Sequence, residues 1–473
     1  MWSSALKLLG GILVTFAVVW ALVLGWWQSN DYEPGRIDLA LYLGALPFAL
    51  VGGFLLLRGF IDHLQTPVSA AKPAIGEVVD DDPLAPSRAQ SDAAERSFSL
   101  CLVDAFVEAP GGTSVDEILS AIDSGKRPGP SSSLVDESGF PVFVGDVPGL
   151  DIDAFKEKFS AVIGDCRPCF DRDVDFRALA LLDGVMTKAH ESVMRLLAPG
   201  GEGIRLKVIW LVPKRWSVEC FPALRSWIQE NYWSALRTSD LEISIFPIGR
   251  ESEALLRLDQ VILDVNRDRS AQDLVLIVAA DSFIDEIGLA ALEHSGKLFS
   301  PRHQNQKIPG EAAVALLLAT KEILGHLGTE DAISVSRVAF GVRDKSVEAG
   351  GRIGGRLLGE LVCGLVETGG LEPADVKLVV SDTDHRAGYV TELLEGLGQN
   401  FQHLDPIGDC QAIGAVNGAT GPVGELIALA CARTHVLSLN APVLCLSNQD
   451  EKNRAVLLAT PFVANGDPEP CTT

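Results

Sequence analysis

The chain has 473 residues and a formal net charge of −24, with 39 Lys and Arg against 63 Asp and Glu. Binding of a nucleic-acid backbone needs clustered Lys and Arg, so this balance argues against a nucleic-acid partner. The length allows one large or two medium domains with a sizeable buried core.

Two uncharged apolar segments open the chain. Leu8 to Trp27 covers twenty residues and Leu39 to Leu57 covers nineteen, so each is long enough to cross the hydrocarbon layer as a helix. A cleaved signal peptide is the alternative for the first segment, but only Lys7 precedes it as a positive charge and a second apolar segment follows at once. We therefore predict a transmembrane helical hairpin over residues 1–63.

The charges that flank these segments indicate an orientation. Lys7 and Arg58 lie on one side of the predicted hairpin and Arg36 on the other, which places both ends in the cytoplasm by the positive-inside rule. The nine cysteines form no regular framework, as is typical of a reducing compartment. We predict a bacterial inner-membrane location with the soluble part facing the cytoplasm.

Residues 64–97 are rich in Pro, Ala, Ser and Asp, and this composition predicts a flexible linker. Apolar runs then alternate with helical patterns, which favours an α/β domain with buried strands. In the first series, residues 98–330, we expect strands at 99–107, 205–212, 241–248, 273–281 and 311–319, with helices at 176–197 and 252–265. In the second series, residues 331–473, we expect strands at 333–342, 376–382, 441–448 and 454–462, with helices at 355–368, 389–397 and 423–432.

Four segments suggest a family when they are taken in order. They are a helix leading into DLVLIVAAD, the run GEAAVAL from Gly310, the segment LEPADVKLVVSD from Leu371, and IGAVNGATGPVGELIALACA from Ile413. Together they resemble the thiolase superfamily, and within it the β-ketoacyl synthases, over residues 206–462. The resemblance implies a layered αβαβα domain of two similar halves, and a homodimer formed through an edge strand.

The residues that perform the chemistry of that family are not retained. The resemblance implies a cysteine nucleophile at the start of a buried helix, but the matching Gly249–Ser252 contains none. The first catalytic histidine of the family falls near Ser381 or Asp382, and the second falls on Ala415. The family lysine five residues before that second histidine falls on Cys410. The usual decarboxylative condensation is therefore not supported.

Four residues remain as candidates for other chemistry. Ser252 stands at the start of the matching helix, and Asp382 and His385 share one turn in which a carboxylate could orient an imidazole as a general base. Polar residues are also ordinary formers of turns at strand ends. Cys410 follows Asp409 in a glycine-flanked loop, and is either a reactive thiol or a small buried apolar residue.

Cys166 and Cys169 form the one C-x-x-C pair of the sequence. The acidic segment FDRDVDF follows them and would raise the pKa of a thiolate, which favours a reduced structural pair over a redox site. A zinc site needs four ligands, and no second Cys or His pair has suitable spacing, so we predict neither a metal nor a cofactor. The glycine-rich Gly351–Gly355 lacks the spacing of a phosphate-binding loop and indicates close packing or a helix start.

Three functional hypotheses follow. The first is a membrane-anchored, non-catalytic protein that acts as a binding module, scaffold or adaptor, for example in an envelope or secretion complex. The second is an acyltransferase or condensing-type enzyme that acts on acyl thioesters or lipids with a non-standard nucleophile. The third is a thiol redox sensor that uses Cys166 and Cys169.

Overall fold

The computed structural model describes residues 94–462, except 164–169, 171, 199–202, 269–271, 330, 350 and 399, together with residues 19–23, 25–29, 35, 42 and 46. It divides into two compact units, residues 1–79 and 80–473, which we describe separately. The bounds predicted for the hairpin, the linker and the two halves stay predictions.

In the first unit, residues 19–23 and 25–29 are helical. Trp27 packs edge to face against Tyr42, with 6.3 Å between the ring centroids. Most of the two predicted spans, 8–27 and 39–57, lies outside the described residues. Among those that are described, no helix combines the length and apolar character needed to cross a bilayer.

The second unit is built on one 11-stranded sheet within its described residues. The strands of the first series follow the spatial order β5-β4-β6-β7-β1, in which β4 is parallel to β5 and β6, and β7 is antiparallel to β6 and β1. Their bounds are β1 (Ser99–Glu108), β4 (Arg205–Pro213), β5 (Leu241–Ile248), β6 (Asp273–Ser282) and β7 (Glu311–Ala319).

The strands of the second series repeat this arrangement. Their order is β11-β10-β12-β13-β8, with β10 parallel to β11 and β12, and β13 antiparallel to β12 and β8. When β9 is set aside, which pairs with β13 beside this path, both series place their strands in the order third, second, fourth, fifth, first. The first strands of the two series, β1 and β8, pair antiparallel and join the two halves. The bounds are β8 (Ile333–Ser336), β9 (Ala339–Val342), β10 (Leu378–Ser381), β11 (Cys410–Ala412), β12 (Val443–Ser447) and β13 (Asn453–Pro461).

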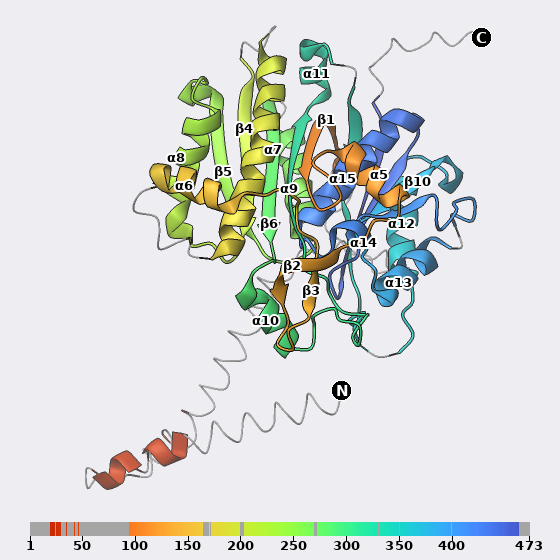
Figure 1. The fold of residues 1–473 in the computed structure, drawn as a ribbon. Helices are drawn as coiled ribbons and strands as arrows, with labels where there is room; N and C mark the ends of the chain where they lie inside the picture. Colours follow the sequence, from red (N-terminus) through yellow and green to blue (C-terminus); the bar gives the residue numbers. More distant parts are fainter. Residues whose placement is uncertain are drawn as a thin grey trace, which may run out of the picture. The chain divides into compact units, whose positions relative to one another are not determined.

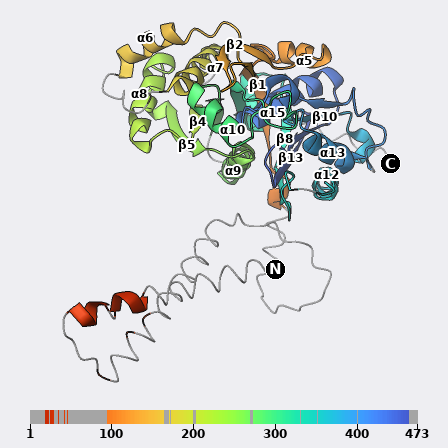
Figure 2. The same ribbon diagram turned by 60° about the horizontal axis from the view of Figure 1, so that its bottom comes forward.

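Helices cover both faces of each half. The bounds are α5 (Val115–Asp123), α6 (Ile152–Ile163), α7 (Asp173–Leu197), α8 (Phe221–Tyr232), α9 (Glu253–Arg267), α10 (Glu286–His294), α11 (Lys321–Leu327), α12 (Arg356–Thr368), α13 (Ala387–Leu397), α14 (Gly414–Asn417) and α15 (Val423–Leu439). Short 3-10 helices occupy η3 (Val218–Cys220), η4 (Thr238–Asp240) and η5 (Pro373–Asp375). Figures 1 and 2 show α7 and α8 on one outer side, α12 and α13 on the other, and α15 between them.

Alternating side chains of the strands divide the core into layers. Ile277 of β6 and Val380 of β10 belong to one apolar cluster with α9 and α15, which therefore lie between the two sheet halves. Val278, the neighbour of Ile277, faces α7 and α8 instead. Val379, the neighbour of Val380, faces α12 and α13. Successive side chains of a strand point to opposite faces, so these three clusters define an αβαβα arrangement.

The structure departs from the sequence-based expectation in two regions of the sheet and its edge, besides adding shorter elements. The strand expected over 333–342 is split into β8 and β9, because Asp259 of α9 accepts the N–H of Val338 at 2.9 Å and pairs with Arg337 at 2.5 Å. Residues 129–144, which lie outside the strands and helices expected from the sequence, form a hairpin of β2 (Gly129–Val135) and β3 (Pro141–Val144). Val144 of this hairpin packs against Leu289 of α10.

Candidate functional site

The start of α9, in the first half, lies against the start of α15, in the second half. Ser252 is the N-cap of α9 and has a left-handed backbone, with φ 76° and ψ −13°. A left-handed conformation is costly for a residue other than glycine, and it persists where the surroundings require it. Here it directs the Ser252 N–H toward α15.

Glu425, in the first turn of α15, accepts the hydrogen bonds that the start of α9 offers. Its carboxylate accepts from the N–H of Ser252 and, at 3.0 Å, from the N–H of Leu255. The side chain of Glu425 is fully buried. The first N–H groups of a helix have no partner within the helix, so this carboxyl group caps α9.

A second buried carboxylate, Asp382, follows β10 and shares a hydroxyl with Glu425. The Ser447 Oγ lies 2.7 Å from Asp382 Oδ2 and 3.3 Å from Glu425 Oε1. A hydroxyl has one hydrogen to donate, so it cannot donate to two carboxylates at once. Both contacts are hydrogen bonds when one of the two carboxyl groups is protonated and donates to Ser447 while Ser447 donates to the other. Asp382 Oδ1 also accepts the N–H of Asn448 at 2.9 Å.

The electrostatics of the site favour this shared proton. Burial raises the pKa of Asp382 to about 7, against the opposing effect of its hydrogen bonds from Ser447 and Asn448. Burial and the charge of Asp382 raise the pKa of Glu425 well above its usual value. Glu251 raises both pKa values further, although Lys307 pairs with Glu251 at 3.2 Å.

The loop that would hold the second histidine of the resembling family is packed tightly against the backbone of Asp382. Ala415 lies in α14, next to Gly414. A Cβ added to Gly414 would lie 2.2 Å from the backbone oxygen of Asp382, which excludes any larger residue there. The Gln449 amide also donates to that oxygen.

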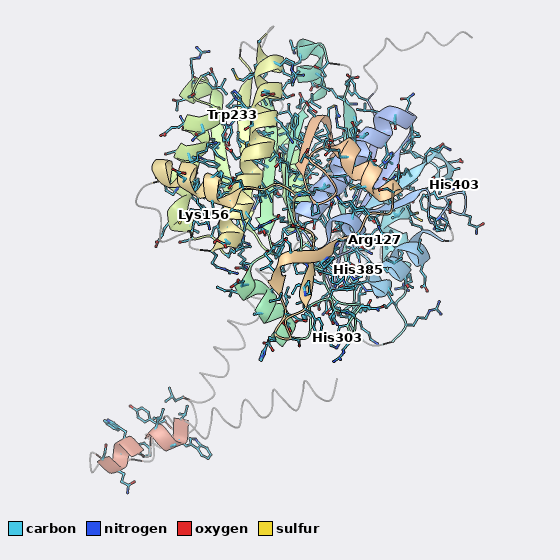
Figure 3. All side chains as sticks on the ribbon, viewed as in Figure 1. Arg127, Lys156, Trp233, His303, His385 and His403 are labelled. Atoms are coloured by element: carbon cyan, nitrogen blue, oxygen red, sulfur yellow. The ribbon has the colours of Figure 1, made fainter. Side chains whose placement is uncertain are left out.

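Two of the candidate residues, Ser252 and Asp382, belong to one cluster. Glu425 accepts the Ser252 N–H, and the Ser447 hydroxyl lies between Glu425 and Asp382. His385, labelled in Figure 3, is separate from this cluster and packs edge to face on Phe299 at 5.3 Å. Within the described residues its Nε2 is buried without a hydrogen-bond partner. The carboxylate of Asp384 binds Arg386 at 2.8 Å and is therefore engaged away from the imidazole.

Cys410 lies on the other face of the sheet. It packs with the outer cluster that α12 and α13 cover, whereas Asp382 and Glu425 lie toward the central helices. Burial, Asp409 and Asp405 raise the pKa of the Cys410 thiol to about 11, so it is protonated and a poor nucleophile at neutral pH. Cys166 and Cys169 lie outside the described residues, and Cys220 is disulfide-bonded.

Sequence reasoning missed Glu425 and Ser447. The available signal was a single carboxylate in the otherwise apolar start of a helix, GELIALACA, because a buried charge is rarely retained without a partner.

No family model matches the sequence, and no curated protein matches it. Solved structures do match the fold. A ketosynthase/chain length factor for ishigamide has a TM-score of 0.55 at 13% identity and covers 78% of this chain and 100% of its own. A type II polyketide-synthase ketosynthase complex with its acyl-carrier protein has a TM-score of 0.54 at 12% identity, covering 77% and 100%. A β-ketoacyl synthase from Burkholderia phymatum has a TM-score of 0.51 at 13% identity, covering 77% and 100%.

Proposed function

We propose that this chain, which has the thiolase-like fold of ketosynthases, does not condense acyl groups and works by binding other proteins as a scaffold or adaptor at a bacterial inner membrane. The observation that carries the proposal is the hydrogen bonding of Glu425 to the start of α9. In a ketosynthase the N–H groups at that helix start would have to be available to the nucleophile. In this chain the buried side chain of Glu425 accepts them.

The two neighbouring carboxylates oppose a nucleophile at Ser252. Activation of a hydroxyl or thiol requires a positive environment or an adjacent base that can accept the proton. Asp382 and Glu425 already share a proton across Ser447, and a negative charge beside Ser252 would raise the pKa of any nucleophile placed there. Ser252 itself is 3% exposed, so a substrate does not reach it.

The oxyanion of a condensation also lacks its donors. Two imidazoles would have to stand where Asp382 and Ala415 stand, and neither an acceptor carboxylate nor a methyl group can stabilise a developing negative charge. Asp382 is 2% exposed and its oxygens are engaged by Ser447 and Asn448. These contacts support a structural role for the cluster.

The acyltransferase alternative makes a direct prediction that the first proposal excludes. We would purify the full chain in neutral nanodiscs, incubate it with malonyl and decanoyl thioesters, and measure its intact mass. We expect no covalent adduct. A stable adduct that disappears in Ser252→Ala or Cys410→Ser would overturn the proposal and identify the nucleophile.

The redox alternative rests on Cys166 and Cys169. Counting of free thiols before and after mild oxidation of the full chain tests it, with Cys166→Ser as the matched variant. An unchanged thiol count at this pair removes the redox hypothesis.

The disulfide of Cys220 bears on the compartment of the domain. Disulfides persist in oxidising environments, so it favours the side of the membrane opposite to the one that Lys7 and Arg58 predict. Protease access to the domain in spheroplasts decides between the two sides.

Membrane anchoring through 8–27 and 39–57 and a homodimer belong to the same proposal. β5 ends the sheet of the first half and, among the described strands, pairs with β4 alone. Such an open edge can pair with the same edge of a second copy. Sedimentation of the full chain in nanodiscs of known mass measures the copy number. A single copy at all concentrations would remove the homodimer.

A further inference from the structure

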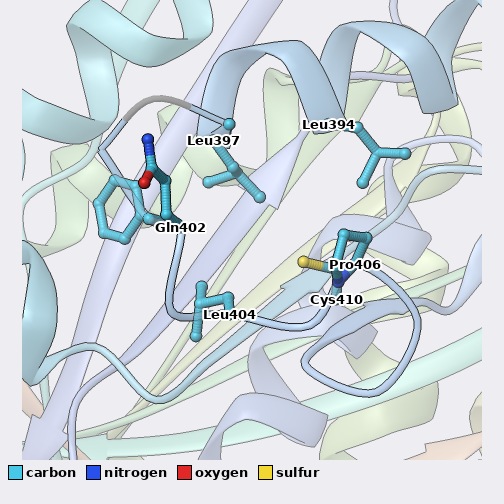
Figure 4. Close-up of a pocket in the computed structure, with 8 residues that line it drawn as sticks. Leu394, Leu397, Gln402, Leu404, Pro406 and Cys410 are labelled. Atoms are coloured by element: carbon cyan, nitrogen blue, oxygen red, sulfur yellow. The ribbon is translucent and has the colours of Figure 1, made fainter.

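We propose that a groove on the outer side of the second half binds a large apolar side chain carried by a basic segment of a partner protein. This inference rests on the proposed binding function and names the chemistry of the partner. The groove lies between α13 and residues 401–410 (Figure 4). Its lining residues are Leu394, Leu397, Gly398, Phe401, Gln402, Leu404, Pro406 and Cys410.

The groove is apolar and has fixed walls. Its volume is about 300 Å³. Leu397, Phe401 and Leu404 are 4%, 2% and 8% exposed and belong to the core between α13 and the sheet, so packing on their other side holds them in place. A preformed apolar concavity of this kind can accept an anchoring side chain with little ordering of the protein.

The rim of the groove exposes more apolar surface to solvent. Leu394 is 37% exposed, and Ile407, next to the lining residue Pro406, is 90% exposed. A single exposed apolar residue is ordinary, but here the exposed side chains border an apolar cavity. Leu394 lines the groove and Ile407 follows the lining residue Pro406, so a partner segment seated in the groove would meet both segments.

Two acidic residues, Asp405 and Asp409, directly precede the lining residues Pro406 and Cys410. Asp405 and Asp409 fix the loop around Ile407, since Asp405 Oδ1 accepts the Ile407 N–H at 3.2 Å and Asp409 Oδ2 accepts the Asp405 N–H at 2.8 Å. Within the part of the chain that the structure describes, neither carboxylate forms an ion pair with Lys or Arg. The negative charges of Asp405 and Asp409 act on the lining residue Cys410, because both raise the pKa of its thiol.

This combination of charges selects among possible occupants. A basic segment brings Lys or Arg to Asp405 and Asp409 while its apolar side chain enters the groove. A fatty acid or an anionic lipid would bring another negative charge to the same two carboxylates.

The test uses the full chain in phosphatidylcholine nanodiscs and two synthetic fluorescent peptides with the same Leu and Trp residues. One peptide has Lys and the other Gln at its polar positions. We expect the Lys peptide to bind at least about 10-fold more tightly than the Gln peptide by fluorescence anisotropy, and to slow alkylation of Cys410 by N-ethylmaleimide at alkaline pH. The rate at Cys363, which does not line the groove, should not change.

Two variants locate the binding. Ile407→Lys adds a positive charge at the rim and should weaken binding of the Lys peptide by about 10-fold. Val218→Lys is the matched control, because Val218 is a 67% exposed apolar residue in the first half, and it should leave binding unchanged. Both side chains are exposed, so neither change should affect folding.

Three results would overturn the groove proposal. The first is equal binding of the two peptides, and the second is an equal effect of the two variants on binding. The third is protection of Cys410 from alkylation by anionic vesicles, or by a higher protein concentration, when the peptides give no protection. The acyl-adduct measurement is independent of these results. If neither an adduct nor peptide binding is found, the groove proposal fails and the non-catalytic proposal stands. If both an adduct and peptide binding are found, the non-catalytic proposal fails and the groove proposal stands.

Discussion

The carboxylate of Glu425 accepts the backbone N–H of Ser252, so a helix in the second half supplies the cap for a helix in the first half. The contact is fully buried and lies at the junction of the two halves. Because Glu425 also shares the Ser447 hydroxyl with Asp382, one proton is retained there. The stability of the two halves is therefore coupled to pH.

The stability of the protein should fall as pH rises from about 4 to 7. Asp382 has a pKa of about 7 in the folded protein against a usual value of 3.8, so the folded state binds the proton more tightly than the unfolded state and loses that advantage as the proton leaves. Over the interval between these two pKa values the free energy of unfolding should fall by about 4 kcal/mol. Urea unfolding of the full chain, followed by tryptophan fluorescence, measures it.

Asp382→Asn is the matched variant for this pH dependence. Asparagine keeps the shape, cannot titrate, and allows Ser447 to donate to Glu425. We expect the free energy of unfolding to vary much less between pH 4 and 7 in this variant than in the natural chain. An equal slope in both proteins would assign the pH dependence to other groups.

Replacement of Glu425 should show what the cap contributes. Glu425→Ala leaves the N–H groups of Ser252 and Leu255 buried without an acceptor, which should lower the free energy of unfolding by about 2–4 kcal/mol. Glu425→Gln retains one acceptor oxygen and should cost less. Denaturant unfolding near pH 6 compares the two. Equal stability of Glu425→Ala and the natural chain would show that water replaces the carboxylate.

Ser252→Gly should stabilise the protein, because glycine adopts φ 76° without the steric cost that serine bears. The expected gain in the free energy of unfolding is about 0.5–1 kcal/mol. Ser124→Gly is the control, since Ser124 caps α5 with φ −76° and should gain nothing. If both changes destabilise the protein equally, the left-handed backbone of Ser252 carries no strain.

Gly414→Ala should destabilise the protein strongly, because its Cβ would lie 2.2 Å from the backbone oxygen of Asp382 and would displace the loop or Asp382. We expect a loss of more than about 2 kcal/mol. Gly364→Ala, on α12, meets nothing within 4 Å and should be neutral or stabilising. Thermal unfolding of the two variants side by side gives the comparison.

The fold could be predicted from sequence because long apolar runs such as β6 and β7 are buried on both faces and lie in an order typical of the ketosynthases. The solved structures confirm that fold. The β2–β3 hairpin could not be predicted, because its Gly-, Pro- and Ser-rich sequence gains its order from packing on α10.

The candidate site could be predicted only in part. Asp382 and Ser252 were found because they stand at positions that the resembling family uses. The position of Cys410 could not be inferred from its glycine-flanked loop, because the face of the sheet to which a residue points depends on register, and a shift of one residue reverses it. The contact of Ser447 with Glu425 joins residues from separate elements, and no spacing in the sequence indicates it.

The most direct test of the account is the release of CO₂ from a malonyl thioester by the full chain in nanodiscs, compared with buffer and with Asp382→Asn. Condensing enzymes must drive this decarboxylation, and a cluster of two carboxylates that share a proton cannot stabilise the negative charge that it generates. The account predicts a rate equal to that of buffer for both proteins. A rate above buffer that Asp382→Asn abolishes would contradict it and show that the buried cluster is an active site.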